Sequence, residues 1–319
     1  MNITAVVVTW NGLEDFQRCI SSLQKQTRRI DRIVVVNNGS SDGTKEWLDS
    51  QTGLETIHQL DNLGNGGGLK VGYERALELG ADLVYSIDDD AVAKEDALEK
   101  VLSAWERLSR TGDWVLTGLC VDPHSGQTGP VAVALPGLPT FPQKVIINVK
   151  DAPPELIQDG VFLNWGQPFM GVLISAKVIR EIGCPRPEYF IRGEDYEYLL
   201  RCLRHCRVGV VLDSIVYHPM VVEPPSMNQR LGPKDYYTIR NHNIISREYF
   251  PRLLNSPLFR IAKYGRDLLS DLVHGRGFDR LRFYAYYDAI RPSCSYRRDR
   301  TTIGPEQPTI GQQHLPSPR

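Results

Sequence analysis

The stretch Leu83-Val84-Tyr85-Ser86-Ile87-Asp88-Asp89-Asp90-Ala91 joins a short apolar run to three consecutive carboxylates. Residues 83–87 are apolar and rich in β-forming side chains, which predicts a buried strand. Three like charges at the end of a strand repel one another, so a proton or a cation has to relieve the repulsion. Carboxylate oxygens suit Mg²⁺ and Mn²⁺, which keep coordination positions open for phosphate oxygens. The stretch therefore suggests a metal site, and from these residues alone an acidic turn exposed to water is the alternative.

The residues before this stretch alternate between strand-like and helix-like patterns. Apolar runs that predict strands span residues 5–8, 32–36 and 56–60, and segments with helical spacing span 13–26, 45–50 and 69–79. This alternation predicts an α/β fold with a doubly wound, mostly parallel sheet. Ligands of such sheets bind beyond the carboxyl ends of the strands, and the polar and glycine-rich clusters of this half all follow strands.

A glycine cluster, Gly64-Asn65-Gly66-Gly67-Gly68-Leu69, precedes the third predicted helix. It does not match the dinucleotide fingerprint G-x-G-x-x-G, because its last position is leucine, and the chain has no P-loop motif. Glycines at a helix start allow the backbone to approach a diphosphate or a sugar closely. A flexible turn between strand and helix explains the same residues equally well.

The composition is that of an ordinary globular protein. The 319 residues are 41% hydrophobic and 24% charged, and the net charge of −1 gives no general attraction to nucleic acid. The chain enters its first strand almost at once, so no secretory signal is expected, and no apolar stretch approaches the ~20 residues that span a bilayer. The six cysteines are scattered and are expected to be cytosolic thiols; Cys202 and Cys206 lack a second ligand pair for zinc.

An ordered set of motifs resembles the family 2 inverting glycosyltransferases of the GT-A fold. These motifs are Val6-Val7-Val8-Thr9-Trp10-Asn11, Val35-Val36-Asn37-Asn38-Gly39-Ser40-Ser41-Asp42-Gly43-Thr44, Asn62-Leu63-Gly64 with Gly67-Gly68, and Asp88-Asp89-Asp90. Within the family the chain is most similar to the branch of bacterial galactofuranosyltransferases and rhamnosyltransferases. The resemblance covers about residues 3–250, and the order and spacing of the motifs make it specific.

The resemblance implies roles for these strand ends. Residues expected to hold the nucleotide-sugar donor are Thr9, Asn11, Asn37, Asn38, Asn62, Gly64, Gly67, Asp88 and Asp89. Asp88 and Asp90 are expected to face the metal and the sugar-phosphate. Many relatives have aspartate where this chain has Asn37, which still accepts a hydrogen bond from a pyrimidine N–H, but more weakly than a carboxylate.

The second half supplies an acidic pair, Glu194-Asp195, at the start of a predicted helix. Acidic residues at a helix start also stabilise its dipole, which is the simpler explanation. The resemblance implies that Asp195 is the general base and that Glu194 contacts the acceptor hydroxyl. It also places His218 beside Asp88 and Asp90 as a metal ligand, and an imidazole favours Mn²⁺ slightly over Mg²⁺.

Two further residues are expected at the acceptor. Trp165 offers a flat apolar ring on which a sugar can stack, although core packing is equally compatible with this residue. Arg240 lies in a Tyr-Tyr-x-x-Arg-Asn segment that resembles one common in this branch, and it is expected to contact the acceptor or the donor phosphate. A salt bridge that caps a helix is the alternative for Arg240.

These parts predict an enzyme that moves a sugar to a hydroxyl in one displacement, with inversion at the anomeric carbon. UDP-galactofuranose is the expected donor and dTDP-rhamnose the alternative, and the expected acceptor is a cell-surface glycan or a lipid-linked glycan. A non-catalytic nucleotide-sugar-binding protein is the alternative from another class. It is disfavoured because Asp88, Asp90, Asp195 and His218 are all present.

The C-terminal part changes character after a catalytic domain expected at residues 1–250. Residues 255–300 carry ten basic and five acidic residues, a local charge of +5, interleaved with aromatic and aliphatic side chains. We expect residues 251–291 to form basic amphipathic helices that lie on an anionic membrane, which would make the protein peripheral on the inner face of the cell membrane. Packing on the catalytic domain or in a homo-oligomer is the alternative. Residues 292–319 are expected to be disordered.

Overall fold

The computed structural model describes residues 1–128, 131–132, 146–147, 154–163, 170–219, 232–249, 258, 261–262, 264–266, 269 and 280–290. Within these residues the main feature is a ten-stranded sheet with the order β3-β2-β1-β4-β11-β6-β12-β10-β9, and β5 pairs with β12. A separate two-stranded sheet joins β7 (Val131–Ala132) to β8 (Ile146–Ile147).

The N-terminal half of the large sheet is parallel. It contains β1 (Ile3–Thr9), β2 (Arg32–Asn37), β3 (Leu54–His58) and β4 (Leu83–Ile87). The second half is mixed, because β11 (Met170–Ser175) runs antiparallel to both β4 and β6 (Trp114–Val121). The long strand β12 (Arg207–Tyr217) is parallel to β6, while β5 (Val92–Ala93), β9 (Ile157–Gln158) and β10 (Val161–Leu163) make antiparallel pairs at its margins. The predicted α/β fold with a mostly parallel sheet is therefore confirmed.

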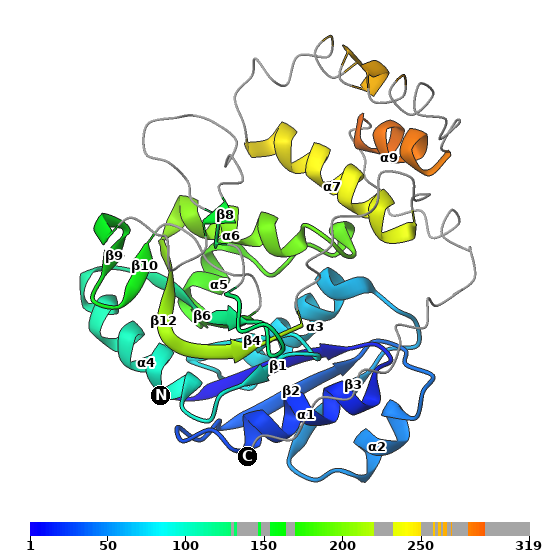
Figure 1. Cartoon of the computed structure of the whole chain (residues 1–319). Helices are drawn as coiled ribbons and strands as arrows, with labels where there is room; N and C mark the ends of the chain where they lie inside the picture. Colours follow the sequence, from blue (N-terminus) through cyan, green and yellow to red (C-terminus); the bar gives the residue numbers. More distant parts are fainter. Residues whose placement is uncertain are drawn as a thin grey trace.

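Helices cover both faces of this sheet (Figure 1). One face packs on α1 (Leu13–Gln24), α2 (Thr44–Ser50) and α4 (Ala97–Leu108), and the other packs on α3 (Gly64–Glu78), α5 (Ala176–Ile182) and α6 (Glu194–His205). The period of two in β1 explains both contacts, because Ala5 and Val7 lie in one core cluster and Val6 and Val8 in the other. Each fully buried valine stabilises this arrangement by about 1.5–3 kcal/mol.

The glycine cluster forms the first turn of α3, which begins five residues earlier than the sequence pattern predicts. Its glycines are explained by close packing: a Cβ on Gly68 would lie 2.4 Å from a methyl carbon of Val8. A Cβ on Gly72 would lie 2.4 Å from a methyl carbon of Val6. Helix α3 therefore rests almost directly on β1, which fixes its N-terminus at the carboxyl edge of the sheet.

Two C-terminal helices, α7 (Pro233–Tyr249) and α9 (Arg280–Ile290), lie beyond α6 on the side away from α1 and α2 (Figure 1). Short 3₁₀ turns complete the described chain at Ser109–Thr111 (η1), Pro154–Leu156 (η3) and Pro187–Tyr189 (η4). No helix among the described residues is long and apolar enough to cross a bilayer. The segment 292–319, predicted to be disordered, lies outside the described residues.

Candidate active site at the carboxyl edge of the sheet

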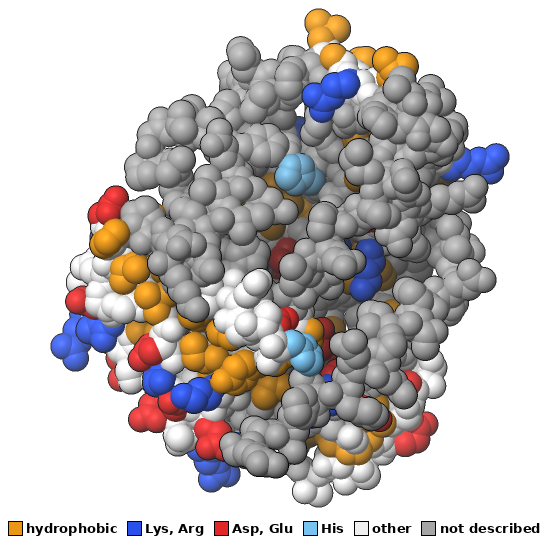
Figure 2. All heavy atoms as spheres, viewed as in Figure 1, with side chains coloured by type: hydrophobic (Ala, Val, Ile, Leu, Met, Phe, Trp, Pro, Cys, Tyr) orange, Lys and Arg blue, Asp and Glu red, His pale blue; other side chains and the backbone are white. Residues whose placement is uncertain are grey.

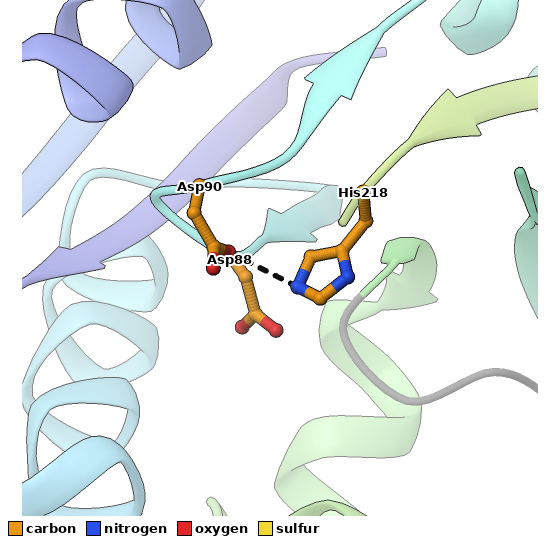
Figure 3. Close-up of side chains that lie close together, drawn as sticks. All are labelled: Asp88, Asp90 and His218. Atoms are coloured by element: carbon orange, nitrogen blue, oxygen red, sulfur yellow. Dashed lines mark ion pairs between the residues drawn. The ribbon is translucent and has the colours of Figure 1, made fainter. Parts of the chain in front are cut away.

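Asp88, Asp90 and His218 come together at the carboxyl edge of the sheet (Figure 3). One ligand atom from each residue lies within 4.8 Å of the others. The pairing of β5 with the end of β12 explains this meeting, because it places Val92 opposite Tyr217, close to both ends of the cluster. Nε2 of His218 lies 3.2 Å from Oδ1 of Asp90. The structure thus brings together the three residues that the sequence predicted as metal ligands.

The three aspartates differ in their proton affinities. Burial raises the pKa of Asp88, and the charges of Asp90, Asp89, Glu194 and Asp195 raise it further. Burial also raises the pKa of Asp89 to about 7, against the opposing effect of the Thr9 hydroxyl and a backbone N–H. For Asp90, burial is outweighed by the interaction with His218, so its pKa is lowered.

This donor set fits a divalent cation. Two carboxylates and an imidazole are ligands that Mn²⁺ accepts, and Mg²⁺ accepts the carboxylates. The raised pKa of Asp88 has the physical signature of a crowded anionic site, because four other carboxylates act on it. Positive charge bound between Asp88 and Asp90 would remove that repulsion.

The acidic pair lies at the N-terminus of α6, where Gly193 has a left-handed φ of 106°. The side chain of Glu194 is 4% exposed; its Oε1 accepts a hydrogen bond from Asn65 Nδ2 at 3.0 Å, and its Oε2 has no partner among the described residues. Burial and the charge of Asp195 raise the pKa of Glu194 to about 8. Burial also raises the pKa of Asp195, although its carboxylate accepts the backbone N–H of Tyr196 at 2.7 Å. A carboxyl with raised proton affinity is suited to accept a proton from a hydroxyl.

The four asparagines predicted at the donor interlock the loops of the carboxyl edge. Asn38 is 1% exposed and its Nδ2 donates to Oδ1 of Asn62 and to the carbonyl of Gly64, both at 3.0 Å. Asn11 accepts the Ser41 N–H at 2.9 Å. These contacts hold the loops after β1, β2 and β3 in fixed positions relative to one another.

The side chain of Asn37 makes contacts within the protein. Its side chain is 2% exposed, its Oδ1 accepts the Ser40 N–H at 3.0 Å, and its Nδ2 lies 3.1 Å from Nδ1 of His58. Asn37 therefore shapes the β2 loop through both ends of its amide. An amide oxygen has two lone pairs, so its predicted bond to a pyrimidine N–H stays a prediction.

The remaining predicted donor residues also lie at this edge. Thr9 is fully buried and adjoins Asp89, while Gly64 and Gly67 form the start of α3. A Cβ on Gly64 would lie 2.3 Å from the carbonyl oxygen of Phe190, and one on Gly67 would lie 2.7 Å from Cβ of Leu63. Packing against the protein thus accounts for both glycines.

Of the two residues predicted at the acceptor, Trp165 lies outside the described residues. Arg240 is 4% exposed, and its guanidinium donates to the carbonyl of Glu188 at 2.8 Å and to Oδ1 of Asn241 at 3.1 Å. Its guanidinium is thus directed into the protein, and within the described residues Arg240 forms no salt bridge of the kind named as the alternative. Its contact with the acceptor or the donor phosphate stays a prediction.

Sequence reasoning missed two residues that contact the acidic pair or its loop. Asn65 was hidden among glycines, and only the fold shows that it reaches Glu194 across 129 positions of sequence. Asn241 follows Arg240 in the Tyr-Tyr-x-x-Arg-Asn segment. The motif therefore pointed to this position but did not indicate its contact with the loop before the acidic pair.

Comparisons with known proteins agree with this architecture. Residues 4–119 match the family model described as glycosyl transferase family 2. The galactofuranosyltransferase GlfT1 of Mycolicibacterium smegmatis is 26% identical over 88% of this chain and 95% of its own length. The dTDP-rhamnosyl transferase RfbF of Shigella flexneri is 25% identical over 86% of each chain.

Solved structures show the same fold. Residues 1–349 of TarS from S. aureus, crystallised with UDP, superpose with a TM-score of 0.50 and 16% identity over 78% of this chain and 66% of that one. GalNAc-T7, crystallised with UDP, GalNAc and Mn²⁺, gives a TM-score of 0.53 and 16% identity over 78% of this chain and 49% of that one. This chain therefore spans less than two thirds of either solved chain. The matched motifs, the strand order and the clustered carboxylates agree on one likeness: the chain has a GT-A-like fold and is similar to the family 2 glycosyltransferases, whose family model it matches over residues 4–119.

Proposed function

We propose that this protein is an inverting galactofuranosyltransferase that uses UDP-galactofuranose. The observation that carries the proposal is the convergence of Asp88, Asp90 and His218 within 4.8 Å at the sheet edge, with the charges of Glu194 and Asp195 acting on Asp88. A donor-side cluster and a proton acceptor thus share one site. The similarity to GlfT1 across 95% of that protein supports galactofuranose as the sugar. The UDP in the TarS and GalNAc-T7 structures supports a uridine nucleotide.

In this proposal Asp195 accepts the proton of the acceptor hydroxyl as its oxygen attacks the anomeric carbon. Glu194 remains protonated near neutral pH, because burial and its neighbour raise its pKa to about 8. It therefore offers the acceptor a neutral hydrogen-bonding group, and only Asp195 needs to be ionised. A single attack opposite the leaving group inverts the anomeric centre without a covalent intermediate.

We further propose that Asp88, Asp90 and His218 hold Mn²⁺ or Mg²⁺. A bound divalent cation would supply positive charge where the departing diphosphate becomes more negative. The Mn²⁺ in the GalNAc-T7 structure supports manganese as the first ion to test. Asp90 is suited to this role because its lowered pKa keeps it ionised and able to coordinate.

The acceptor is proposed to be a glycan on a lipid carrier, reached at a membrane surface. Hydrophobic and basic side chains are visible together over the C-terminal segments at the top of the molecule (Figure 2). Among the described residues there, Leu258 is 80% exposed, Ile261 62% and Leu269 61%. Basic and apolar side chains together favour binding to anionic lipid. Removal of the residues after Asn255 should release the protein from anionic vesicles in a flotation assay, and unchanged binding would refute this part.

The alternative donor is dTDP-rhamnose, which the 25% identity to RfbF favours. Both nucleotides present the same pyrimidine N–H, so the choice depends on contacts to the sugar. A site that hydrogen-bonds one particular sugar hydroxyl discriminates by ~10⁴ or more. The two proposals therefore predict nearly exclusive use of one donor.

The test offers both donors to the purified protein with a lipid-linked or short-alkyl glycoside acceptor and Mn²⁺. With UDP-galactofuranose we expect nucleotide release and an acceptor mass increased by one hexose. With dTDP-rhamnose we expect neither. Asp195→Asn serves as the control for non-enzymatic hydrolysis. Transfer from dTDP-rhamnose with none from UDP-galactofuranose would overturn the donor, while transfer from neither would overturn the proposed function.

A further inference from the structure

The loop before the acidic pair has a strained backbone. Among the described residues, four non-glycine positions have positive φ, and two of them, Phe190 (61°) and Arg192 (65°), lie in this loop. Gly193 follows with a φ of 106°. Phe190, with φ 61° and ψ −70°, is the centre of a γ-turn closed by the Ile191 N–H on the Tyr189 carbonyl at 2.7 Å. This type of γ-turn is rare and costs free energy, so it persists only where the surroundings enforce it.

Contacts from helix α7 hold the loop in this conformation. Asn241 is fully buried, and its Nδ2 contacts the carbonyl oxygens of Tyr189 at 2.7 Å, Arg192 at 2.8 Å and Ile191 at 3.0 Å. An amide has two N–H groups, so these three carbonyls share two donors around a single nitrogen. The loop must therefore curl around Asn241, which is the conformation that its positive φ angles produce.

Two neighbours on α7 complete the contact. Arg240 donates to the Glu188 carbonyl at 2.8 Å and to Oδ1 of Asn241 at 3.1 Å, so it orients the Asn241 amide and holds the start of the loop. The ring of Phe190 stacks on Tyr237 at 4.9 Å between centroids. A Cβ on Gly193 would lie 3.3 Å from Cβ of Asn241, which leaves little room for a side chain there.

The held loop joins the two parts of the site. Its Phe190 carbonyl accepts the N–H of Gly66 at 3.1 Å, which ties the loop to the first turn of α3. Its last residue, Gly193, directly precedes Glu194, and Asn65 of the same α3 turn donates to Glu194. A displacement of the loop would therefore move the acidic pair relative to both α3 and the Asp88 cluster.

We propose that Arg240 and Asn241 are positioning residues for catalysis: from α7 they hold the strained loop 188–193 and so set the place of Glu194 and Asp195. This inference rests on the proposed function for the role of Asp195. It gives the Arg-Asn segment a task other than contact with acceptor or phosphate. It also makes α7 a part of the catalytic unit, although none of its residues touches the reacting atoms in this role.

A matched pair of variants tests the proposal. Asn241→Ala removes the amide that contacts the loop. Asn243→Ala removes an amide of the same helix that is 9% exposed and, among the described residues, donates to the Ile239 carbonyl at 2.6 Å, within α7. Both variants would be measured for hydrogen exchange in peptides covering 64–68 and 187–196, for thermal unfolding, and for kcat and donor KM.

We expect faster exchange in both peptides for Asn241→Ala and unchanged exchange there for Asn243→Ala. Because a misplacement of about 1 Å can cost a factor of ~10² in rate, kcat of Asn241→Ala should fall about 10²-fold, with donor KM changed less than about threefold. Loss of folded protein alone would instead lower the active fraction, without changing the exchange of the remaining folded molecules. Wild-type kcat in folded Asn241→Ala, or an equal loss in Asn243→Ala, would overturn the proposal.

A second variant covers the case in which Asn241→Ala does not fold. Arg240→Lys keeps the charge but loses the fork that reaches two oxygens, so a loss of about tenfold in kcat and intermediate exchange are expected. If wild-type protein transfers neither sugar, the proposed function fails, and the exchange data still decide whether α7 holds the loop. Unchanged exchange in both Asn241→Ala and Arg240→Lys would refute the clamp itself.

Discussion

The Asp88–Asp90 cluster and the Glu194–Asp195 pair use the same functional group in different surroundings. The side chain of Asp90 is 48% exposed and lies 3.2 Å from an imidazole, whereas Glu194 is 4% exposed and accepts its side-chain hydrogen bond from a neutral amide. The first arrangement lowers the pKa of Asp90 and the second raises that of Glu194. Placement in the fold, and not residue type, separates a carboxylate suited to a cation from a carboxyl suited to keep a proton.

The helix N-terminus sharpens this comparison. The dipole of α6 favours negative charge at its first residues by about 0.3–1 kcal/mol. Burial acts in the opposite direction, and with the charge of Asp195 it raises the pKa of Glu194 to about 8 despite the hydrogen bond from the Asn65 amide. The simple interpretation of this pair as dipole-stabilising residues is therefore insufficient.

The largest effect is expected from Asp90→Ala. If the proposed cation is bound there, loss of one carboxylate from the three ligand groups should abolish metal-dependent nucleotide binding and lower turnover by ~10³-fold or more, because the cation would stabilise the leaving group by several kcal/mol. Turnover and nucleotide affinity would be measured with Mn²⁺ and with excess chelator. The matched control is Asp82→Ala, at the opposite end of β4 with a 60% exposed side chain. Full activity in excess chelator would show that turnover does not need a bound cation.

A smaller loss is expected from Asp195→Asn. The amide has nearly the same shape but cannot accept the proton, so kcat should fall by roughly 10²–10⁴ while donor affinity is retained. Single-turnover transfer and donor titration measure the two quantities separately. Asp113→Asn, a partner of Lys177 away from the site, controls for the loss of a negative charge. Wild-type turnover in Asp195→Asn would place the base elsewhere.

The smallest effect is a pH-dependent stability difference in Glu194→Gln. In the unfolded chain Glu194 releases its proton near its ordinary pKa of 4.5, but in the folded protein it retains the proton up to about pH 8. Between these values the unfolded state binds fewer protons, so this group's contribution to stability falls as the pH rises. Glutamine does not titrate, so the variant should gain Tm relative to wild type from pH 5 to pH 8. Each kcal/mol corresponds to about 2–4 °C. Glu74→Gln, at a surface partner of Lys70, is the matched control. A Tm difference between Glu194→Gln and wild type that stays constant from pH 5 to pH 8 would contradict the raised pKa.

The sequence predicted the parts of the site that depend on local pattern. Apolar runs followed by polar residues marked the strand ends, and parallel strands bring such ends to one edge regardless of loop detail. For this reason Asp88 and Asp90 were predicted at this edge, whereas His218, 128 positions after Asp90, was predicted beside them from the family resemblance. The role of the acidic pair in catalysis remains a prediction.

The sequence did not predict the contacts that depend on side-chain reach across the fold. Nothing local distinguishes Asn241, whose amide holds carbonyls about 50 positions away, from Asn243, whose amide bonds within its own helix. Likewise, the glycine cluster at the start of α3 suggested room for a ligand, but Gly68 is required by Val8 of β1 and Gly64 by the Phe190 carbonyl. Close contacts of this kind depend on how the helices pack on the sheet, and the periodicity of the sequence does not specify that packing.

The position of β11 has a consequence for how the chain reaches this structure. β11 separates β4 from β6, two strands that run in the same direction and are both synthesised before it. Until residues 170–175 emerge from the ribosome, the facing edges of β4 and β6 carry unpaired N–H and C=O groups and are free to pair with each other or with another chain. Such a pairing would have to break before β11 enters. The nascent chain is therefore more prone to aggregate than the finished protein, and the surroundings of Asp88 are completed late in biosynthesis.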